Sequence, residues 1–268
     1  MNFGLYAAYL GMRSRQQQLD LLANNIANAS TSGFKADRLL YRSVVAANPN
    51  SNPNAGTSTP GAGAAPSTAT DQKEQLTPLR YGIDVGVVTA QRTDFSAGSI
   101  RETGRSLDIA LNGDGFIVVQ TPRGERYTRQ GSLTLDSSGQ LVTQRGDLVV
   151  GDSGPITVPP GNVSFGEDGS LSVNGSVAGK LKLVRFNNPG TALSKEGDCL
   201  FVANGTEHGQ EATETRVAQG TLELSNVNSL TEMVAMMQNS REFESLQKSV
   251  STLMNELGRK VANEVGRL

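Results

Sequence analysis

Apolar residues recur at helical spacing at both ends of this 268-residue chain, while the middle lacks such a pattern. Near the N-terminus, steps of four and three form one seam, comprising Leu5, Tyr9, Met12, Gln16, Leu19, Ala23 and Ile26. Near the C-terminus a second seam comprises Met233, Met236, Phe243, Leu246, Val250, Leu253, Leu257 and Val261. A heptad seam buries its side chains only against another surface. The two ends therefore either cover the middle as an antiparallel pair or also pack against copies of themselves.

Local signals predict where these helices begin and end. The segment 30–33, Ser-Thr-Ser-Gly, stops the first helix, and Asn28 or Gly33 suits the left-handed turn that follows. Ser229, with Glu232 three residues on, predicts a capping box at the start of the last helix. That helix then runs for about 33 residues without proline, or about 50 Å at 1.5 Å per residue. This length is ordinary for a coiled coil.

The stretch between the helices divides by composition. Residues 46–79 are poor in hydrophobic side chains and rich in Pro, Gly, Asn and Ser, which predicts a linker. Residues 80–221 carry short β-patterned runs separated by turn signals, as in a sandwich or barrel-like domain. The expected fold is α+β, with a discontinuous coiled-coil domain formed by residues 1–45 and 222–268 around this β-rich domain.

Turn chemistry predicts individual hairpins in the β-rich domain. We expect turns at 121–124, at 136–139 and at Asn174-Gly175, the last being the strongest short hairpin signal. The segment 180–186 alternates polar and apolar residues, which predicts one half-buried strand.

Composition excludes several classes of protein. The net charge is −2 and no Lys/Arg-dense stretch is present, so we expect no nucleic-acid partner. Cys199 and His208 are the single cysteine and histidine, so a zinc site built from several such ligands is excluded. No apolar run is long enough for a membrane-spanning helix. The N-terminus lacks the basic and apolar regions of a secretory signal peptide, so we expect no cleaved signal.

Four segments resemble catalytic or binding motifs, and each lacks residues that the corresponding chemistry needs. Residues 151–155, Gly-Asp-Ser-Gly-Pro, resemble a serine-protease nucleophile segment, but no histidine precedes Ser153 to act as its base. Residues 112–115, Asn-Gly-Asp-Gly, lack the Lys-Ser/Thr of a phosphate loop. The acidic turns at 136–139 and 167–169 lack the ligand alternation of a calcium loop. We expect His208 in a solvated loop, and no enzyme activity, cofactor or metal.

Four segments resemble the flagellar rod and hook proteins, in family order across nearly the whole chain. Residues 23–35, ANNIANASTSGFK, resemble the family's N-terminal signature, and residues 225–228, SNVN, resemble its C-terminal partner. Residues 107–116, LDIALNGDGF, and 127–132, YTRQGS, are similar to its central β region.

This resemblance implies a structural subunit of the bacterial flagellar basal body, located in the periplasmic rod. The terminal helices pair into the inner layer of a helical tube and the β domain faces outward. Subunits leave the cell unfolded through the flagellar type III export apparatus. The implied partners are copies of the chain, other rod proteins and that apparatus, with ring or bushing proteins as further candidates.

The signatures have a physical interpretation. Asn24, Asn25 and Asn28 lie at helical spacing and can satisfy backbone groups where the first helix ends. Gly33 supplies backbone freedom, and Phe34 can anchor the turn in the helical seam. Asn226 and Asn228 play the corresponding part where the chain re-enters the tube. The alternative is that these residues are simply good helix caps, and for residues 225–228 alone the two interpretations have equal weight. The expected assembly residues on the helices are Leu5, Tyr9, Met12, Leu19, Ile26, Phe243, Leu246, Val250, Leu253 and Leu257.

Within the family, residues 241–244, Arg-Glu-Phe-Glu, and the compact hairpin at 168–175 favour the proximal rod type over the distal one. The tail beyond Leu257 is longer than expected of either type. Two alternatives stay open. One is a distal rod subunit, and the other is a soluble β-rich binding module with helical dimerisation ends.

Overall fold

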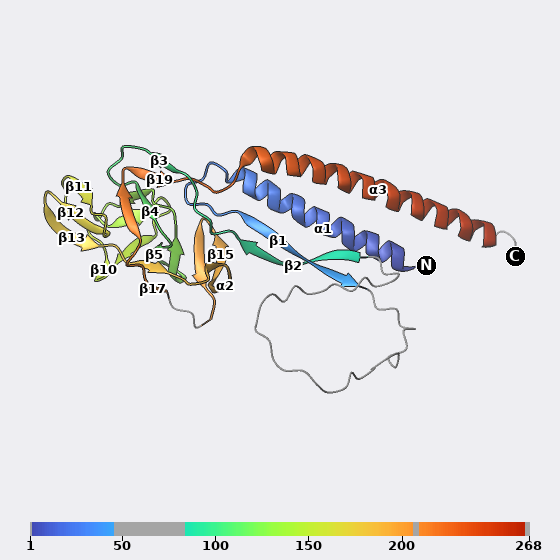
Figure 1. The fold of residues 1–268 in the computed structure, drawn as a ribbon, viewed down its shortest axis with the longest axis horizontal. Coiled ribbons are helices and arrows are strands. Elements are labelled where there is room, and N and C mark those ends of the chain that lie inside the picture. Colours follow the sequence, from blue (N-terminus) through green and yellow to red (C-terminus); the bar gives the residue numbers. More distant parts are fainter. Residues whose placement is uncertain (1, 46–83, 206–208, 266–268) are drawn as a thin grey trace, which may run out of the picture.

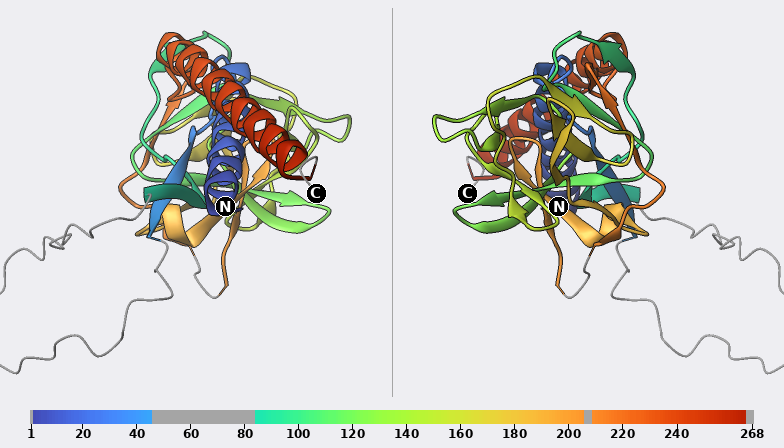
Figure 2. Two further views of the ribbon diagram at one scale, coloured as in Figure 1. Left: turned by 90° about the vertical axis from the view of Figure 1, so that its right-hand side faces the viewer. Right: turned by 90° about the vertical axis from the view of Figure 1, so that its left-hand side faces the viewer.

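The computed structural model describes residues 2–45, 84–205 and 209–265. The protein is elongated, with a β-rich body at one end and a pair of helices projecting from it (Figure 1). Helix α1 (Asn2–Ala27) runs toward the body and α3 (Ser229–Val265) runs away from it, so the two lie antiparallel and in contact. Viewed along the long axis, both chain ends face the same side (Figure 2). The predicted helical ends around a β-rich middle are confirmed.

The helix boundaries agree with the sequence except for the cap of α3. The N-cap is Asn228, whose Oδ1 accepts the Thr231 amide at 3.2 Å and whose carbonyl accepts the Glu232 amide at 3.0 Å. Ser229 is already helical, so the predicted capping box at Ser229 is wrong. Asn is at least as good a cap as Ser, and it lies one position earlier.

A two-stranded ribbon accompanies the helices. Strand β1 (Asp37–Val45) pairs antiparallel with β2 (Asp84–Thr93), and both contact α1. The sequence pattern predicted residues 37–45 as part of the helical domain, but this segment is a strand that turns back along α1 (Figure 1). The predicted linker at 46–79 lies outside the described residues.

The body contains the remaining strands. They are β3 (Ile100–Glu102), β4 (Ile109–Asn112), β5 (Phe116–Thr121), β6 (Gly124–Thr128), β7 (Leu133–Leu135), β8 (Leu141–Thr143), β9 (Leu148–Gly151), β10 (Gly154–Pro155), β11 (Val163–Phe165), β12 (Ser170–Val173), β13 (Ser176–Lys180), β14 (Leu183–Arg185), β15 (Leu193–Gly197), β16 (Leu200–Ala203), β17 (Gln210–Glu211), β18 (Arg216–Gln219) and β19 (Thr221–Glu223), with the short helix α2 (Pro189–Ala192) before β15. The main sheet has the order β15-β16-β6-β5-β9-β8-β7, with β10, β14 and β17 attached. Smaller sheets are β11-β12-β13, β18-β4 and β19-β3.

Two apolar clusters hold the body together. The larger is mostly aliphatic and includes Ile117, Leu133, Leu141 and Val149, all fully buried. The smaller is largely aromatic and is built on Phe116, Tyr127, Phe186 and Phe201. Burial of this much apolar surface, at about 25 cal/mol per Å², is the main source of the body's stability.

The predicted turns are present and one predicted strand is wrong. Asn174 (φ 50°) and Gly175 (φ 84°) are both left-handed, as the tight turn between β12 and β13 requires. In the turn after β7, Asp136 Oδ1 accepts the amides of Ser138 and Gln140. The segment 180–186 is not one strand, because β13 ends at Lys180 and β14 begins at Leu183.

Candidate assembly joint and helix faces

The helices and the body meet at a joint built from four segments of the chain. After α1 the chain turns through residues 28–33 and passes through 33–37 into β1. It crosses into the body at 94–99 and returns to α3 at 224–228. The two crossings are joined by the Leu224 amide, which donates to the Ser99 carbonyl at 2.8 Å.

Two of the predicted asparagines bind backbone groups of this joint. Asn25 is 1% exposed; its Oδ1 accepts the Asp37 amide at 3.1 Å and its Nδ2 donates to the Asp37 carbonyl at 3.0 Å. Asn226 Oδ1 accepts the Ala36 amide at 2.8 Å, and its Nδ2 donates to the Asp94 carbonyl at 2.8 Å. Each side chain thus ties its own element to a neighbouring segment.

The other predicted joint residues take smaller parts. Asn28 Nδ2 donates to the Asn24 carbonyl at 2.9 Å, which helps to close the end of α1. The Asn24 side chain is exposed and lines a hollow of about 560 Å³ together with Asn28 and Phe34. Asn228 caps α3, as described above.

Gly33 and Phe34 lie against the body. Gly33 has φ +69°, and a Cβ there would lie 2.6 Å from Arg129 C and from Gln130 N. Phe34 is 3% exposed, and Lys195 Nζ of β15 lies 3.7 Å from the centre of its ring. The ring contact that the structure defines is therefore with the body, whereas the sequence suggested the helical seam.

A buried charge cluster at the joint was not predicted. Glu223 Oε1 lies 2.6 Å from Lys35 Nζ, and Glu223 Oε2 lies 3.3 Å from Arg129 Nη1. All three side chains are at most 5% exposed. Burial lowers the pKa of Lys35, and the hydrogen bond and charge of Glu223 oppose that shift. Burial likewise lowers the pKa of Arg129.

The face of α1 that packs on α3 is not the predicted seam. Arg15 Nη2 pairs with Glu242 Oε2 at 2.8 Å, Asn239 Nδ2 donates to the Arg15 carbonyl at 3.3 Å, and Asn25 Nδ2 lies 3.5 Å from Glu232 Oε2. Residues 16, 19, 23 and 26 of the predicted seam each come one residue after a position on the contact face, so the seam is turned from that face by about 100° around the helix axis. Tyr9 is accordingly 59% exposed, and Met12, Leu19 and Ile26 are half-buried.

Helix α3 turns residues 243, 246 and 250 of its predicted seam toward α1, whereas Met233 of that seam lies on a second apolar face. Phe243, Leu246 and Val250 are half-buried on the side of Asn239, and Leu253 is 47% exposed. The predicted assembly residues Leu5 and Leu257 have side chains that the structure does not describe. On the opposite side of α3, the outer α3 face consists of Leu230, Met233, Val234 and Met237, with exposed fractions of 71%, 47%, 52% and 56%.

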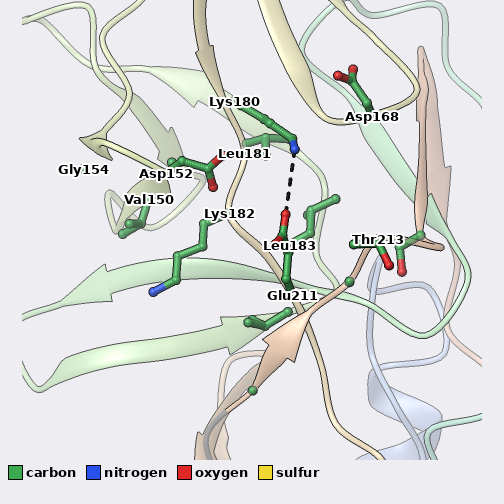
Figure 3. A pocket seen from close by; sticks show the side chains of 15 residues that line it. Val150, Asp152, Gly154, Asp168, Lys180, Leu181, Lys182, Leu183, Glu211 and Thr213 are labelled. Atoms are coloured by element: carbon green, nitrogen blue, oxygen red, sulfur yellow. Dashed lines mark ion pairs between the residues drawn. The ribbon is translucent and has the colours of Figure 1, made fainter.

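The far end of the body has an open cavity of about 540 Å³ (Figure 3). Charged side chains of both signs line it, and its Lys180 and Glu211 form a loose ion pair at 3.9 Å. Lys182 is 3.4 Å from Glu125. The nearby Ser153 is exposed in the tight turn between β9 and β10, and His208 lies outside the described residues. Among the described residues no group of three or more His, Cys, Asp and Glu is placed to hold a metal ion, and no helix there is apolar enough over a sufficient length to cross a membrane.

Three family models match the chain in sequence order. Residues 5–35 match the flagella basal body rod protein model, and residues 110–173 match the flagellar hook protein FlgE/F/G D1 domain. Residues 218–262 match the C-terminal model of the flagellar basal body rod FlgEFG proteins. These segments are α1 with its turn, much of the body, and the return into α3.

Relatives cover the whole chain. The flagellar basal-body rod protein FlgF of Caulobacter vibrioides is 33% identical over 271 residues, covering 100% of both chains. The rod protein FlgG of Borreliella burgdorferi is 32% identical over 284 residues, covering 98% of each. FlgF of Escherichia coli is 33% identical, covering 95% of this chain and 96% of its own. The chain belongs to the flagellar basal-body rod protein family.

Proposed function

We propose that this structural rod subunit is of the proximal type and polymerises through the outward faces of α1 and α3. The observation that carries the proposal is apolar surface that the single chain leaves exposed on both helices. Tyr9 of α1 is exposed, and so are the four apolar residues of the outer α3 face. Monomeric proteins rarely expose contiguous apolar patches of this kind without a binding role.

The α1 seam and the outer α3 face are different surfaces of the chain, and a contact between them in neighbouring subunits supports a filament. A contact between different surfaces of identical chains is heterologous and can propagate without closing. Within one chain the α1 seam and the outer α3 face cannot meet, because the outer α3 face points away from α1. Neighbouring subunits can bring them together, and this coiled-coil-like packing is part of the proposal.

The proximal assignment is supported by residues 241–244 and by the relatives named FlgF. In α3, Glu242 pairs with Arg15 and Phe243 is half-buried beside it, so this motif serves the contact between the helices. FlgG relatives match at nearly the same identity, which keeps the distal type as the alternative. We further propose the other rod proteins and the flagellar type III export apparatus as partners, in line with family membership, and no catalytic activity.

Electron microscopy of basal bodies from a strain lacking this gene tests the assignment. A proximal subunit predicts arrest before the distal rod is added. A rod that starts but stops short of the hook indicates the distal type. Normal flagella without any defect would contradict both forms of the proposal.

A further inference from the structure

We propose that the joint is an electrostatic lock, in which the cluster of Lys35, Glu223 and Arg129, together with the contacts of Lys195 to segment 33–37, holds the body at one orientation on the helix pair. The lock is a property of the single chain and requires no assembly.

The connectivity alone would give a hinge. Within the described residues the chain passes between the helix layer and the body only at 94–99 and 224–228, and these crossings lie side by side through the Leu224–Ser99 hydrogen bond. Two adjacent crossings define one axis, about which the body could swing. A fixed orientation needs bonds placed away from that axis.

Glu223, the last residue of β19, supplies one group of bonds, which tie segment 33–37 and Arg129 to the crossing at 94–99. Its Oε1 accepts from Lys35 Nζ at 2.6 Å and from the Gly98 amide at 3.0 Å, while Oε2 faces Arg129 Nη1 at 3.3 Å. Lys35 Nζ also donates to the Ser96 carbonyl at 2.7 Å. One carboxylate therefore links segment 33–37, the crossing at 94–99 and Arg129, which directly follows β6.

Lys195 of β15 supplies the second group. Its Nζ donates to the Lys35 carbonyl at 2.8 Å, pairs with Asp37 Oδ2 at 3.0 Å and lies over the Phe34 ring. These contacts bind the body directly to segment 33–37 without passing through either crossing. Because Arg129 and Lys195 belong to different parts of the body, the two groups together oppose rotation about the axis.

The charges of the cluster make the lock asymmetric. Lys35 and Arg129 share a single carboxylate, and all three groups are buried. Replacing Glu223 by Gln leaves two buried cations without their anion, whereas replacing Lys35 by Met leaves a neutral Arg129–Glu223 pair. Loss of the anion should therefore release the joint more completely than loss of one cation.

The test is a distance distribution across the joint in the full-length chain, kept monomeric by dilution. Spin labels at Val177→Cys on the body and Gln247→Cys on α3 occupy exposed positions. Cys199 is buried and burial raises the pKa of its thiol, so it should resist labelling. Double electron–electron resonance should give one narrow distribution for the wild type. Glu223→Gln and Lys195→Met should each broaden it and shift its mean, and Lys35→Met should do so less than Glu223→Gln.

The matched control is Glu167→Gln, which makes the same chemical change in the exposed Arg216–Glu167 pair of the body. It should leave the distribution unchanged. Near-ultraviolet circular dichroism checks that the body of each variant is folded. If Glu223→Gln fails to fold, the Lys195→Met distribution tests the proposal instead. That variant should fold, because Asp37, which loses its ion pair with Lys195, keeps its hydrogen bond from Thr93 Oγ1 at 2.7 Å. Wild-type distributions in every folded lock variant would overturn the proposal.

Discussion

Gly33 shows how one residue fixes the route of the chain at the joint. Its φ of +69° is a left-handed conformation, and its α-carbon faces the backbone of Arg129 and Gln130 at a distance that leaves no room for a side chain. Backbone cannot move aside as the end of a flexible side chain can. A glycine is therefore required for two independent reasons.

Gly33→Ala should destabilise the protein by about 2–4 kcal/mol, from backbone strain and overpacking together. Gly11→Ala is the matched control, because Gly11 lies within α1 with open space around its α-carbon. That change should stabilise α1 by up to about 1 kcal/mol. Thermal unfolding followed by circular dichroism measures both, and equal midpoints for the two variants would contradict this account.

Tyr127 makes stability depend on alkaline pH. Burial, with the neighbouring Glu125 carboxylate, raises the pKa of Tyr127 to about 12. The pKa of a tyrosine in an unfolded chain is about 10, so the unfolded chain releases this proton at a lower pH than the folded protein does. The folded state therefore loses this stabilisation as the pH rises from about 10 to 12.

Tyr127→Phe should remove this dependence. Between about pH 9 and pH 12 the wild type should lose about 1–3 kcal/mol more unfolding free energy than the variant. Urea unfolding at several pH values measures the difference. Tyr9→Phe, at an exposed position, should follow the wild type. Parallel pH profiles for wild type and Tyr127→Phe would show that the phenol is not the cause.

At the residue scale, the sequence predicted the asparagines of the joint but not its charges. Asn25 and Asn226 were expected to satisfy backbone groups, and both do so. Lys35 and Glu223 lie 188 positions apart, and nothing in either neighbourhood indicates that the two will meet. Single-sequence patterns report local periodicity, whereas such pairs depend on how the elements are arranged in space.

At the element scale, periodicity identified both helices but not the face on which α1 meets α3. The contact face of α1 includes polar residues such as Arg15 and Asn25, which pair with Glu242 and Glu232. Of the apolar seam one position away, Tyr9 is exposed and Met12, Leu19 and Ile26 are half-buried. Hydrophobic patterning marks the apolar face of a helix without showing what covers it, so it did not identify the largely polar face that meets α3.

The sequence likewise predicted the features of the strands that depend on local residues and missed those that depend on distant contacts. Hairpin turns were predicted correctly, because Asn174-Gly175 and the Asp136 turn depend on local chemistry. Strand β1 was missed, since its pairing with β2 joins segments that 38 intervening residues separate in the sequence. The split of 180–186 follows from contacts, because Leu181 bridges to Gly151 while Leu183 and Val184 pair with β5.

The cap of α3 gives a prediction at this scale. Asn228→Ala should cost about 0.5–2 kcal/mol, because it leaves the Thr231 amide without its side-chain acceptor. Ser229→Ala should change stability by less than about 0.5 kcal/mol, since Ser229 is an exposed helical residue. Thermal unfolding monitored by helical circular dichroism compares the two. A larger loss from Ser229→Ala would restore the capping box that the sequence suggested.

At the scale of the whole molecule, the chain separates a compact body from a helical pair that the body does not cover. Helix α3 has 37 residues and α1 has 26, so α3 is about 16 Å longer at 1.5 Å per residue. The contacts of Asn25 with Glu232 and of Arg15 with Glu242 place the extra length of α3 beyond the N-terminal end of α1, and Leu253 and Met254, which lie opposite that end, are about half exposed. The outer α3 face is exposed in the single chain, and under the proposed function neighbouring rod subunits cover it.

The most direct test of this account is complementation of a deletion strain with a chain altered on the outer α3 face. Met237→Asp places a charge at a position that is 56% exposed, so the isolated chain should fold normally but fail to enter the rod. Val177→Asp makes a similar change on the body, at a position 76% exposed, and should restore rods and swimming. Electron microscopy of purified basal bodies reads out both. Incorporation of the Met237→Asp chain at the wild-type level would contradict assembly through the exposed helix faces.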